Sequence, residues 1–368
     1  MPLDDRKTGL GWYIFRFVKT LAQVNPPMEI TIFAFKNDRV FFDEIDLPQG
    51  WELRIVPAFF SRGIFNLCWI WWISMSLPGK YDEVYYPALN RRAPLCFSNK
   101  NTGCLMDLGE YHFSKKYTLA RNLYVKKILS VQSRHVRSIF AISAATRADI
   151  IKYYNIPGER VVINHLGPDD NAFYPVEQEK AKRRVEKYFP VRSFLLYVSR
   201  LEHPAKNHVF LVELFDLLKK EGFSDLQLVF IGSRWNNWQD VYKLMEQSKY
   251  REDIYHFEDV DQKDMKHFYS AADCYVHPSL WEGFGYPVVE AMYCGTPVLV
   301  ARNSSLVELI PSGEFSFADS NEAREKVKQI LCNKQLAGER GESCREYAHR
   351  FSMKAHIQRF LNFVKEKD

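Results

Sequence analysis

The run HPSLWEGFGYPVVEAM, from His277 to Met292, carries the densest set of residues that could do chemistry. A strand is expected to end there and a helix to start at Pro287, because proline is well tolerated at the first helical position. Backbone amides at a helix N-terminus favour an anionic or polar ligand oxygen. The amides concerned belong to Gly283, Phe284, Gly285 and Tyr286. The sequence therefore predicts a ligand-binding loop between the strand and the helix.

Two carboxylates belong to this run, Glu282 in the expected loop and Glu290 in the expected helix. Helical periodicity does not pair them, so a two-carboxylate site of the kind that hydrolyses glycosides is disfavoured. Two separate tasks fit better, with one carboxylate holding sugar hydroxyls and the other holding ribose hydroxyls. The alternative is a capped helix with incidental acidic residues.

The run SRLEHPAKNH begins at Ser199, directly after an expected strand, and contains the cations Arg200 and Lys206. Two cations beside a turn that opens a helix can bind a diphosphate. They can also neutralise a leaving group as its charge grows, in place of a divalent metal. Because no metal-ligand spacing is found in the sequence, we expect neither a metal nor a cofactor. A third and weaker signal is TGLG at residues 8–11, where Gly9 and Gly11 precede an amphipathic segment and a plain turn is the alternative.

These segments must be positioned by their secondary structure, and strand and helix patterns alternate along almost the whole chain. Such alternation predicts an α/β fold with mostly parallel sheets, whose ligands bind beyond the carboxyl ends of the strands. The expected strands are 29–35, 52–56, 83–86, 139–142, 161–166, 194–198, 226–231, 254–257, 274–277 and 297–300. The expected helices are 12–21, 144–154 with Ser143 as its cap, 207–220, 238–247, 263–270 and 287–293.

The length of 368 residues suggests two domains, at roughly 100–200 residues for each. The stretch 174–190 is charged and carries Pro175 and Pro190, so we place the boundary within it. The expected domains are residues 1–175 and 176–351.

Cysteine usage and the N-terminal residues bear on the compartment. The seven cysteines form no CxxC pair, which fits a reducing compartment better than a disulfide framework. Residues 1–11 are charged and are not followed by the apolar core of a secretory signal, so we expect a cytoplasmic protein. The apolar run 64–77 is too short to span a bilayer. We expect a buried helix or strand pair there, and the alternative is a membrane-facing surface with Trp69, Trp71 and Trp72.

The net charge of +5 is unevenly spread, because the segment from Lys115 to Arg137 has seven basic residues and no acidic one. The plain interpretation is a solvated helix face. The alternative is a surface that meets anionic lipid or a phosphorylated acceptor. Nucleic-acid binding is disfavoured, since no recognised module accompanies the charge.

Taken together, these segments resemble the retaining GT-B glycosyltransferases of family 4, a group that includes many bacterial lipopolysaccharide and capsule mannosyl- and glucosyltransferases. EGFGYPVVEAM is similar to the E-x7-E signature of that family, and LYVSRLEHPAKNH is similar to its phosphate-binding segment. CGTPVLVARNSSLVEL is similar to its next loop and helix, TGLGWY to its N-terminal glycine loop, and MDLGEYH to the segment after its fourth strand. The resemblance is dense over residues 139–312 and thinner before them.

The resemblance implies two Rossmann-like domains whose parallel sheets face each other across a cleft. A helix at about 355–365, within 352–368, would complete the first domain. The implied reaction is metal-independent transfer of a hexose from a nucleotide-diphosphate sugar to a glycan or lipid-linked acceptor, with retention of configuration. GDP-mannose is the donor that the resemblance suggests, and a lipid-linked acceptor would bring the enzyme to the inner face of the membrane.

The resemblance also implies a role for each matching residue. Glu290 would bind the donor ribose and Glu282 the sugar hydroxyls, while Arg200 and Lys206 would bind the diphosphate. The residues that would line the donor site around them are Ser199, Gly283, Phe284, Gly285, Tyr286, Gly9 and Gly11. Asp107 of MDLGEYH would lie near the acceptor.

Three departures from the family pattern set up the competing hypotheses. Met106 stands where the family usually has histidine before Asp107, most of the first strand is missing, and Val307 replaces a common proline. A degenerate nucleotide-sugar-binding protein of the same fold is therefore an alternative. A phosphorylase that uses inorganic phosphate is a third, with no residue that favours it.

Overall fold

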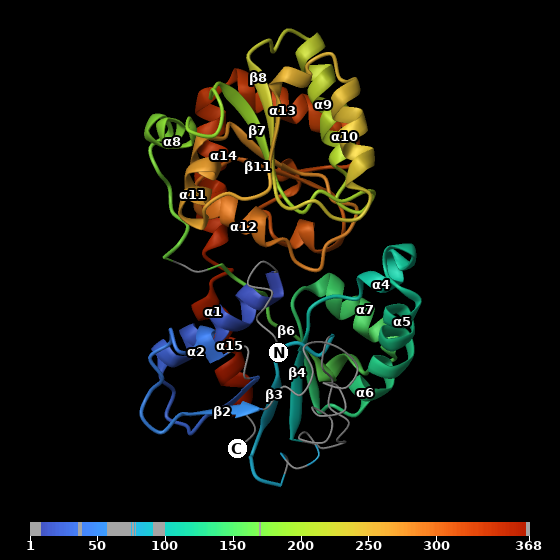
Figure 1. Ribbon diagram of the computed structural model, residues 1–368, viewed down its shortest axis with the longest axis vertical. Helices are drawn as coiled ribbons and strands as arrows, with labels where there is room; N and C mark the ends of the chain where they lie inside the picture. The colour runs from blue at the N-terminus through green and yellow to red at the C-terminus, as the bar shows by residue number, and fades with distance from the viewer. Residues whose placement is uncertain are drawn as a thin grey trace. The chain divides into compact units, whose positions relative to one another are not determined.

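The computed structural model describes residues 9–35, 39–56, 75, 77, 79–90, 100–168 and 171–365. The chain forms two compact units with parallel sheets (Figure 1). Unit 1 consists of Met1–Leu108, Thr118–His165 and Met353–Asp368, and unit 2 consists of Gly109–Tyr117 and Leu166–Ser352. Thr8 and most of the apolar run 64–77, including Trp69, Trp71 and Trp72, lie outside the described residues.

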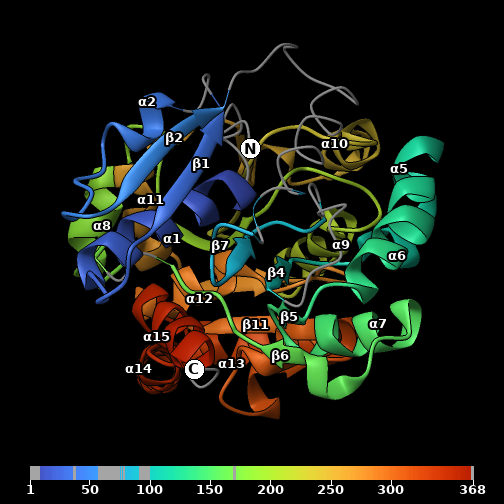
Figure 2. The ribbon, with the colours of Figure 1, turned by 90° about the horizontal axis from the view of Figure 1, so that it is seen from below.

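Unit 1 contains a two-stranded parallel sheet, β1-β2, and a four-stranded parallel sheet in the order β3-β4-β5-β6. Figure 2 shows α1 and α15 on one side of the second sheet and α5, α6 and α7 on the other. The strands are β1 (Thr31–Phe35), β2 (Glu52–Val56), β3 (Val84–Tyr86), β4 (Asn101–Leu105), β5 (Ser138–Ala141) and β6 (Val161–Ile163). The helices are α1 (Gly9–Val24), α2 (Arg39–Phe42), α5 (Leu119–Leu123), the π-helix η4 (Tyr124–Leu129), α6 (Ser130–Arg134), α7 (Ala144–Tyr154), the 3₁₀ turn η5 (Gly158–Arg160) and α15 (Met353–Lys365).

The last helix, α15, is part of the core of unit 1 although it follows all of unit 2 in the chain. The ring of Phe360 lies 5.3 Å from that of Phe17, 4.7 Å from that of Tyr85 and 5.9 Å from that of Phe140. His356 is fully buried, with Nε2 3.1 Å from the Tyr13 hydroxyl and Nδ1 3.0 Å from the His165 carbonyl oxygen. The core of unit 1 therefore requires residues from both ends of the sequence.

Unit 2 is built on one six-stranded parallel sheet in the order β12-β11-β10-β7-β8-β9. Figure 1 shows α9 and α10 on one side of this sheet and α11, α12 and α14 on the other. The strands are β7 (Ser193–Val198), β8 (Leu226–Ile231), β9 (Ile254–Phe257), β10 (Cys274–His277), β11 (Val298–Ala301) and β12 (Ser316–Phe317). The α-helices are α4 (Gly109–His112), α8 (Gln178–Val185), α9 (His208–Lys220), α10 (Trp238–Gln247), α11 (Gln262–Ala271), α12 (Tyr286–Tyr293), α13 (Ser320–Cys332) and α14 (Lys334–Ala348). The 3₁₀ turns are η3 (Ser114–Lys116), η6 (Arg251–Asp253), η7 (Ser304–Glu308) and η8 (Gly313–Phe315).

The strand order of unit 2 defines where a ligand can bind. β8 and β9 extend the sheet from one edge of β7. The chain then returns to the other edge of β7, where β10, β11 and β12 extend the sheet in the opposite direction. In an open parallel sheet, a crevice forms outside the carboxyl ends of the strands at such a reversal. The reversal lies between β7 and β10, so the two loops that follow these strands are the expected ligand site.

Several sequence expectations need correction. The stretch 174–190 contains α8, which buries Ala181 and Val185, and unit 2 begins at Leu166, so the boundary at residue 175 stays a prediction. The acidic anchor for this stretch is the buried Asp264, which binds Arg184, Lys187 and Tyr188. The expected N-terminal glycine loop is shortened, since α1 begins at Gly9 instead of residue 12. Among the described residues, none of the helices combines the length and hydrophobicity needed to cross a bilayer.

Candidate functional site

The loops after β7 and β10 are joined by backbone and side-chain hydrogen bonds. The Leu280 amide donates to the Ala205 carbonyl at 3.0 Å, and Nδ2 of Asn207 donates to the Pro278 carbonyl at 3.2 Å. The fully buried hydroxyl of Tyr197, on β7, lies 2.8 Å from the Lys206 carbonyl oxygen and 2.9 Å from Oγ of Ser279. The two predicted binding segments therefore form one structure.

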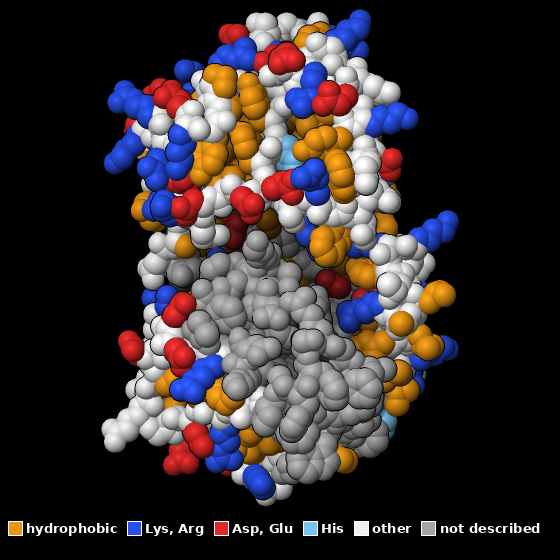
Figure 3. All heavy atoms as spheres, viewed as in Figure 1, with side chains coloured by type: hydrophobic (Ala, Val, Ile, Leu, Met, Phe, Trp, Pro, Cys, Tyr) orange, Lys and Arg blue, Asp and Glu red, His pale blue; other side chains and the backbone are white. Residues whose placement is uncertain are grey.

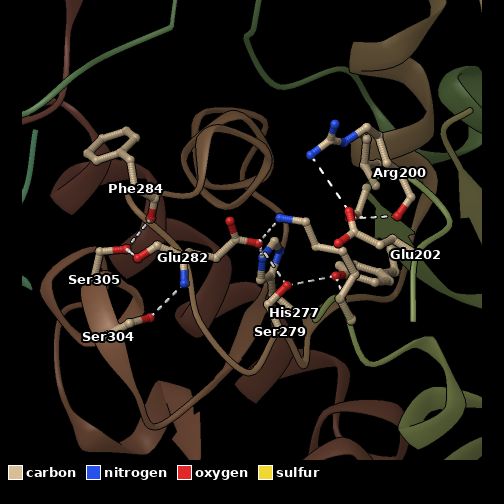
Figure 4. A network of polar contacts seen from close by, with 12 residues as sticks. Arg200, Glu202, His277, Ser279, Glu282, Phe284, Ser304 and Ser305 are labelled. Carbon is tan, nitrogen blue, oxygen red and sulfur yellow. Dashed lines mark hydrogen bonds and ion pairs between the residues drawn. The ribbon is translucent and has the colours of Figure 1, made fainter. Parts of the chain in front are cut away.

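Glu282 lies at the centre of the polar network in Figure 4. Its Oε1 atom is 2.6 Å from Nζ of Lys206, 3.0 Å from Nε2 of His277 and 2.7 Å from Oγ of Ser279. Among the described residues, the hydrogen bonds of this carboxylate all involve Oε1, which leaves Oε2 as the acceptor for a ligand. Burial alone would raise the pKa of Glu282, but the Lys206 ammonium and His277 hold that pKa well below its ordinary value. The carboxylate is therefore ionised at neutral pH.

His277, at the end of β10, orients Glu282 as a neutral ring. Burial lowers the pKa of His277, even though the Glu282 carboxylate opposes this shift. An ionised carboxylate only accepts hydrogen bonds, so Nε2 of the neutral ring carries the proton and donates to Glu282. Nδ1 then accepts from the Tyr275 hydroxyl, 2.9 Å away. This chain of contacts fixes the carboxylate from inside the sheet.

Arg200 is held by an acid and an aromatic ring while its side chain stays 44 % exposed. Its Nη2 atom lies 3.7 Å from Oε2 of Glu202, and its guanidinium carbon lies 4.9 Å from the ring centroid of Trp235. Glu202 is almost fully buried and also binds Nζ of Lys116 at 2.6 Å. Figure 4 shows Arg200 and Glu202 beside the network of Glu282, which is also ion-paired with Lys206.

The segment Gly109–Tyr117 brings further residues to unit 2. Besides the Lys116–Glu202 ion pair, the Lys116 carbonyl accepts a hydrogen bond from Nδ2 of Asn236 at 3.3 Å. The ring of His112 stacks on Trp281, with a centroid distance of 4.5 Å and an interplanar angle of 23°. Trp281 precedes Glu282 directly, so His112 contacts the binding loop itself.

The loop after β11 fixes the backbone of the binding loop. The Glu282 amide donates to Oγ of Ser304 at 3.0 Å, and Oγ of Ser305 lies 3.0 Å from the Glu282 carbonyl oxygen and 2.8 Å from that of Phe284 (Figure 4). Gly285 has a φ of +115°, a conformation that favours glycine, and it precedes α12, which starts at Tyr286. The amides at residues 283–286 therefore lie at a helix N-terminus, as the sequence predicts.

The backbone at Gly232 lies close to the backbone of the loop after β7. Gly232 follows β8 with a φ of +146°, and a Cβ atom there would lie 2.2 Å from the Ser199 carbonyl oxygen. The Ser199 amide donates to the Ile231 carbonyl at 2.9 Å. Glycine at this position thus lets the Ser199–Arg200 backbone pack against the end of β8.

Glu290 lies on α12, and its Oε2 atom accepts a hydrogen bond from the buried Tyr269 hydroxyl at 2.9 Å. The structure thus brings Ser199, Arg200, Lys206, Glu282 and the 283–286 loop into one region of unit 2. Glu290 is on the helix that follows this loop. Gly9, Gly11 and Asp107 belong to unit 1, and their roles stay predictions.

Sequence reasoning missed several residues of this network. His277 and Ser279 stand in the same motif as Glu282, and Glu202 stands between the two predicted cations, so their spacing was a usable signal. Trp235, Lys116 and Ser305 come from other loops, and no local pattern pairs them with the site. Among the described residues, the structure shows no group of three or more His, Cys, Asp or Glu side chains that could hold a metal ion.

Comparisons with known proteins agree with this geometry. Residues 178–351 match the family model described as Glycosyl transferases group 1. The chain is 30% identical over 352 residues to O-antigen chain mannosyltransferase B of Escherichia coli. The aligned region covers 90% of this chain and 88% of that relative. Its fold is similar to that of sucrose-phosphate synthase from Thermosynechococcus elongatus, with a TM-score of 0.75 at 18% identity over 98% of this chain and 93% of that one. It is also similar to Anabaena Alr3699/HepE in complex with UDP and glucose, with a TM-score of 0.72 at 17% identity over 98% and 96% of the two chains.

The two units with parallel sheets, and their likeness to these solved structures, define the GT-B fold. More specifically, the chain belongs to the group 1 glycosyltransferases.

Proposed function

We propose that this enzyme transfers mannose from GDP-mannose to a glycan or lipid-linked acceptor in the synthesis of a cell-surface polysaccharide. The contact between Lys206 and Glu282 carries the proposal, because it places an ammonium group and a carboxylate side by side at the strand reversal. A nucleotide-diphosphate sugar needs both, a cation for its diphosphate and an acceptor for its sugar hydroxyls. The name of the relative from Escherichia coli supports mannose as the sugar.

In this proposal the two sides of the network bind adjacent parts of the donor. Lys206 has three N–H donors, of which Glu282 takes one, so the others can bind phosphate oxygens. The exposed guanidinium of Arg200 binds the same diphosphate. Oε2 of Glu282 accepts from sugar hydroxyls, and the amides of residues 283–286 add donors at the start of α12.

The nucleoside is assigned to Glu290. Its carboxylate can accept two hydrogen bonds from a ribose, and Tyr269 fixes its orientation from the interior. Gly9, Gly11 and Asp107 of unit 1 are proposed to meet the sugar and the acceptor.

We further propose that the reaction retains the anomeric configuration and needs no divalent metal. The bond between the anomeric carbon and the diphosphate oxygen breaks while the acceptor oxygen attacks from the same face. The acceptor proton passes to the leaving phosphate oxygen, and the nucleoside diphosphate departs. Arg200 and Lys206 neutralise the charge that grows on it.

A thermal-shift panel tests the donor assignment. The purified chain is heated with GDP, UDP, ADP and their mannose or glucose conjugates, with and without EDTA. A ligand that binds only the folded state raises the unfolding temperature. We expect the largest shift with GDP-mannose, unchanged by EDTA. A larger shift with another nucleotide would reassign the donor, and loss of the shift in EDTA would contradict the metal-free site.

A turnover assay separates the enzyme from a degenerate binding protein. On prolonged incubation an intact site should slowly hydrolyse the bound donor, and NMR of the released sugar before mutarotation reports its anomeric configuration. The α-anomer from an α-linked donor is the expected result. Tight donor binding without any hydrolysis or transfer would favour the degenerate alternative.

A further inference from the structure

Glu202 is a buried carboxylate that lies between two cationic side chains. It is 1% exposed, and Nζ of Lys116 lies 2.6 Å from its Oε1 atom. Nη2 of Arg200 lies 3.7 Å from its Oε2 atom (Figure 4). The side chain of Lys116 is 16% exposed, whereas that of Arg200 is 44% exposed. Lys116 is therefore the main counter-ion of Glu202, and much of the Arg200 guanidinium stays accessible to a ligand.

Burial distinguishes this ion pair from the charge pairs on the surface of unit 2. The upper part of Figure 3, where Figure 1 draws this unit, shows blue and red side chains beside one another at several places. Arg345 and Glu342, for example, are 2.6 Å apart with side chains 39% and 52% exposed. Such pairs contribute little, because water solvates both charges. A buried carboxylate that loses its counter-ion keeps a charge that water does not solvate.

The loop after β8 fixes the backbone on both sides of Glu202. Before it, the Trp235 amide donates to the Leu201 carbonyl at 2.9 Å. After it, the His203 amide donates to the Asn236 carbonyl at 3.1 Å. Because the backbone of Glu202 is held in place, any change of its partner must come from the side chains.

The same loop also positions both cations. Nδ2 of Asn236 donates to the Lys116 carbonyl at 3.3 Å. The ring centroid of Trp235 lies 4.9 Å from the guanidinium carbon of Arg200. Three segments of unit 2 that are distant in sequence thus meet at the one carboxylate of Glu202.

We propose that Lys116 is a positioning residue of the donor site that acts through Glu202. Its ammonium group neutralises this carboxylate, so that Arg200 binds the diphosphate of the donor. Without Lys116, Glu202 would take Arg200 as its counter-ion, and its negative charge would repel the diphosphate. The inference rests on the proposed function, because that function assigns Arg200 to the diphosphate.

The balance of charge separates this proposal from a purely structural role of the ion pair. Two cations and one anion leave a net positive charge beside the diphosphate, whereas Arg200 and Glu202 alone leave none. The harm done by losing Lys116 should therefore disappear when Glu202 is neutralised as well. If the pair only anchored the segment Gly109–Tyr117, removing both partners would be no better than removing one.

The test is calorimetric titration of the purified chain with GDP, and with UDP in parallel. K116M should bind the nucleotide about tenfold more weakly than wild type, and E202Q about threefold more tightly. The double variant K116M/E202Q has the same net charge as wild type and should return to within about twofold of wild-type affinity. K116R keeps the charge and should retain most of the affinity.

Matched controls separate this effect from a general loss of charge or of fold. Lys115 is exposed on the same turn as Lys116, so K115M removes the same charge beside the ion pair and should bind like wild type. K116M should weaken GDP by a larger factor than GMP, since the repulsion grows with the charge of the phosphates. Unfolding temperatures are measured for every variant. If K116M does not fold, K116Q and K116Q/E202Q give the same comparison.

Two results would overturn the proposal. One is a K116M variant that binds the nucleotide like wild type. The other is a K116M/E202Q variant that binds as weakly as K116M, since Lys116 would then act on the ligand or on the fold without Glu202. In both cases normal wild-type binding leaves the proposed function standing. If wild type binds neither GDP nor UDP, the proposed donor site fails, and this inference fails with it.

Discussion

The Nζ atom of Lys206 and the Oε1 atom of Glu282 are 2.6 Å apart, and both side chains are at least four-fifths buried, with exposed fractions of 16% and 13%. The sequence assigns these two residues to different parts of a ligand, yet here they bind each other. Breaking a partly buried ion pair leaves the remaining charge without its partner. A change in either residue will therefore alter the electrostatics of the other.

Replacing Lys206 by alanine should lower turnover by about 10²–10³-fold, because the leaving diphosphate loses a cation that stabilises its growing charge. Steady-state kinetics with saturating donor measure this effect. K220A, at an exposed position away from the site, serves as the control. Equal turnover in K206A and wild type would remove Lys206 from the reaction.

The same variant should move the acid limit of donor binding. In the wild type, Lys206 and His277 hold the pKa of Glu282 well below its ordinary value against the opposing effect of burial. Without Lys206 the effect of burial prevails, so the pKa of Glu282 should rise and the ionised form should be lost at a higher pH. Donor dissociation constants measured from pH 7 downward should show binding failing earlier in K206A. Parallel pH profiles would mean that Lys206 does not set this pKa.

Glu290→Ala should weaken donor binding by about tenfold or more, since a carboxylate that accepts ribose hydroxyls contributes roughly 1.5–3 kcal/mol. Tyr269→Phe removes the 2.9 Å hydrogen bond that orients this carboxylate and should give a smaller loss. Calorimetric titration with the nucleoside diphosphate measures both. The interpretation fails if Glu290→Ala binds the nucleotide normally.

Gly232→Ala should destabilise unit 2 by about 1–3 kcal/mol, because it combines a positive φ with a clash against the Ser199 backbone. It should also weaken donor binding through Arg200. Gly338→Ala is the matched control, since a Cβ atom there meets no heavy atom within 4 Å and the residue lies inside α14. That change should be neutral or stabilising. Thermal unfolding compares the two, and similar effects would argue against the clash.

Acid should destabilise unit 1 through His356. Burial lowers the pKa of His356 from 6.5 to about 3, so the unfolded chain binds a proton at a higher pH than the folded chain does. Stability is therefore full above pH 6.5 and falls as the pH drops from 6.5 toward 3, by up to about 1.4 kcal/mol per pH unit. His356→Gln should show a shallower loss than wild type over this window. The unfolding temperature as a function of pH is the measurement.

The sequence predicts the strands and helices of unit 2 best. The expected bounds of β8, β9, β10 and α10 match the structure. Each of these strands consists of aliphatic, aromatic or cysteine residues except for one polar residue, and α10 shows helical periodicity. β4 was missed because its sequence, NTGCL, contains few hydrophobic residues. All five of its residues are nevertheless buried. Its assignment depends on pairing with β3 and β5.

The residues of the candidate site also fall into two groups, those that the sequence predicts and those that it does not. Arg200, Lys206, Glu282 and Glu290 stand in local motifs and could be named from spacing alone. The neutral state of His277, the contact of Trp235 with Arg200 and the pairing of Lys116 with Glu202 depend on loops that are distant in sequence.

The position of α15 imposes an order on folding during protein synthesis. A ribosome makes chains from the N-terminus, and domains that are complete early usually fold first. Unit 1 begins first but lacks Phe360 and His356 until residues 353–365 have emerged, which is after the whole of unit 2. We therefore expect unit 2 to reach its native state first, while the aromatic core around Phe17 and Tyr13 forms only when α15 is available. During that interval the N-terminal half of the nascent chain exposes apolar surface. We therefore expect chaperones to bind this half for longer than they bind unit 2.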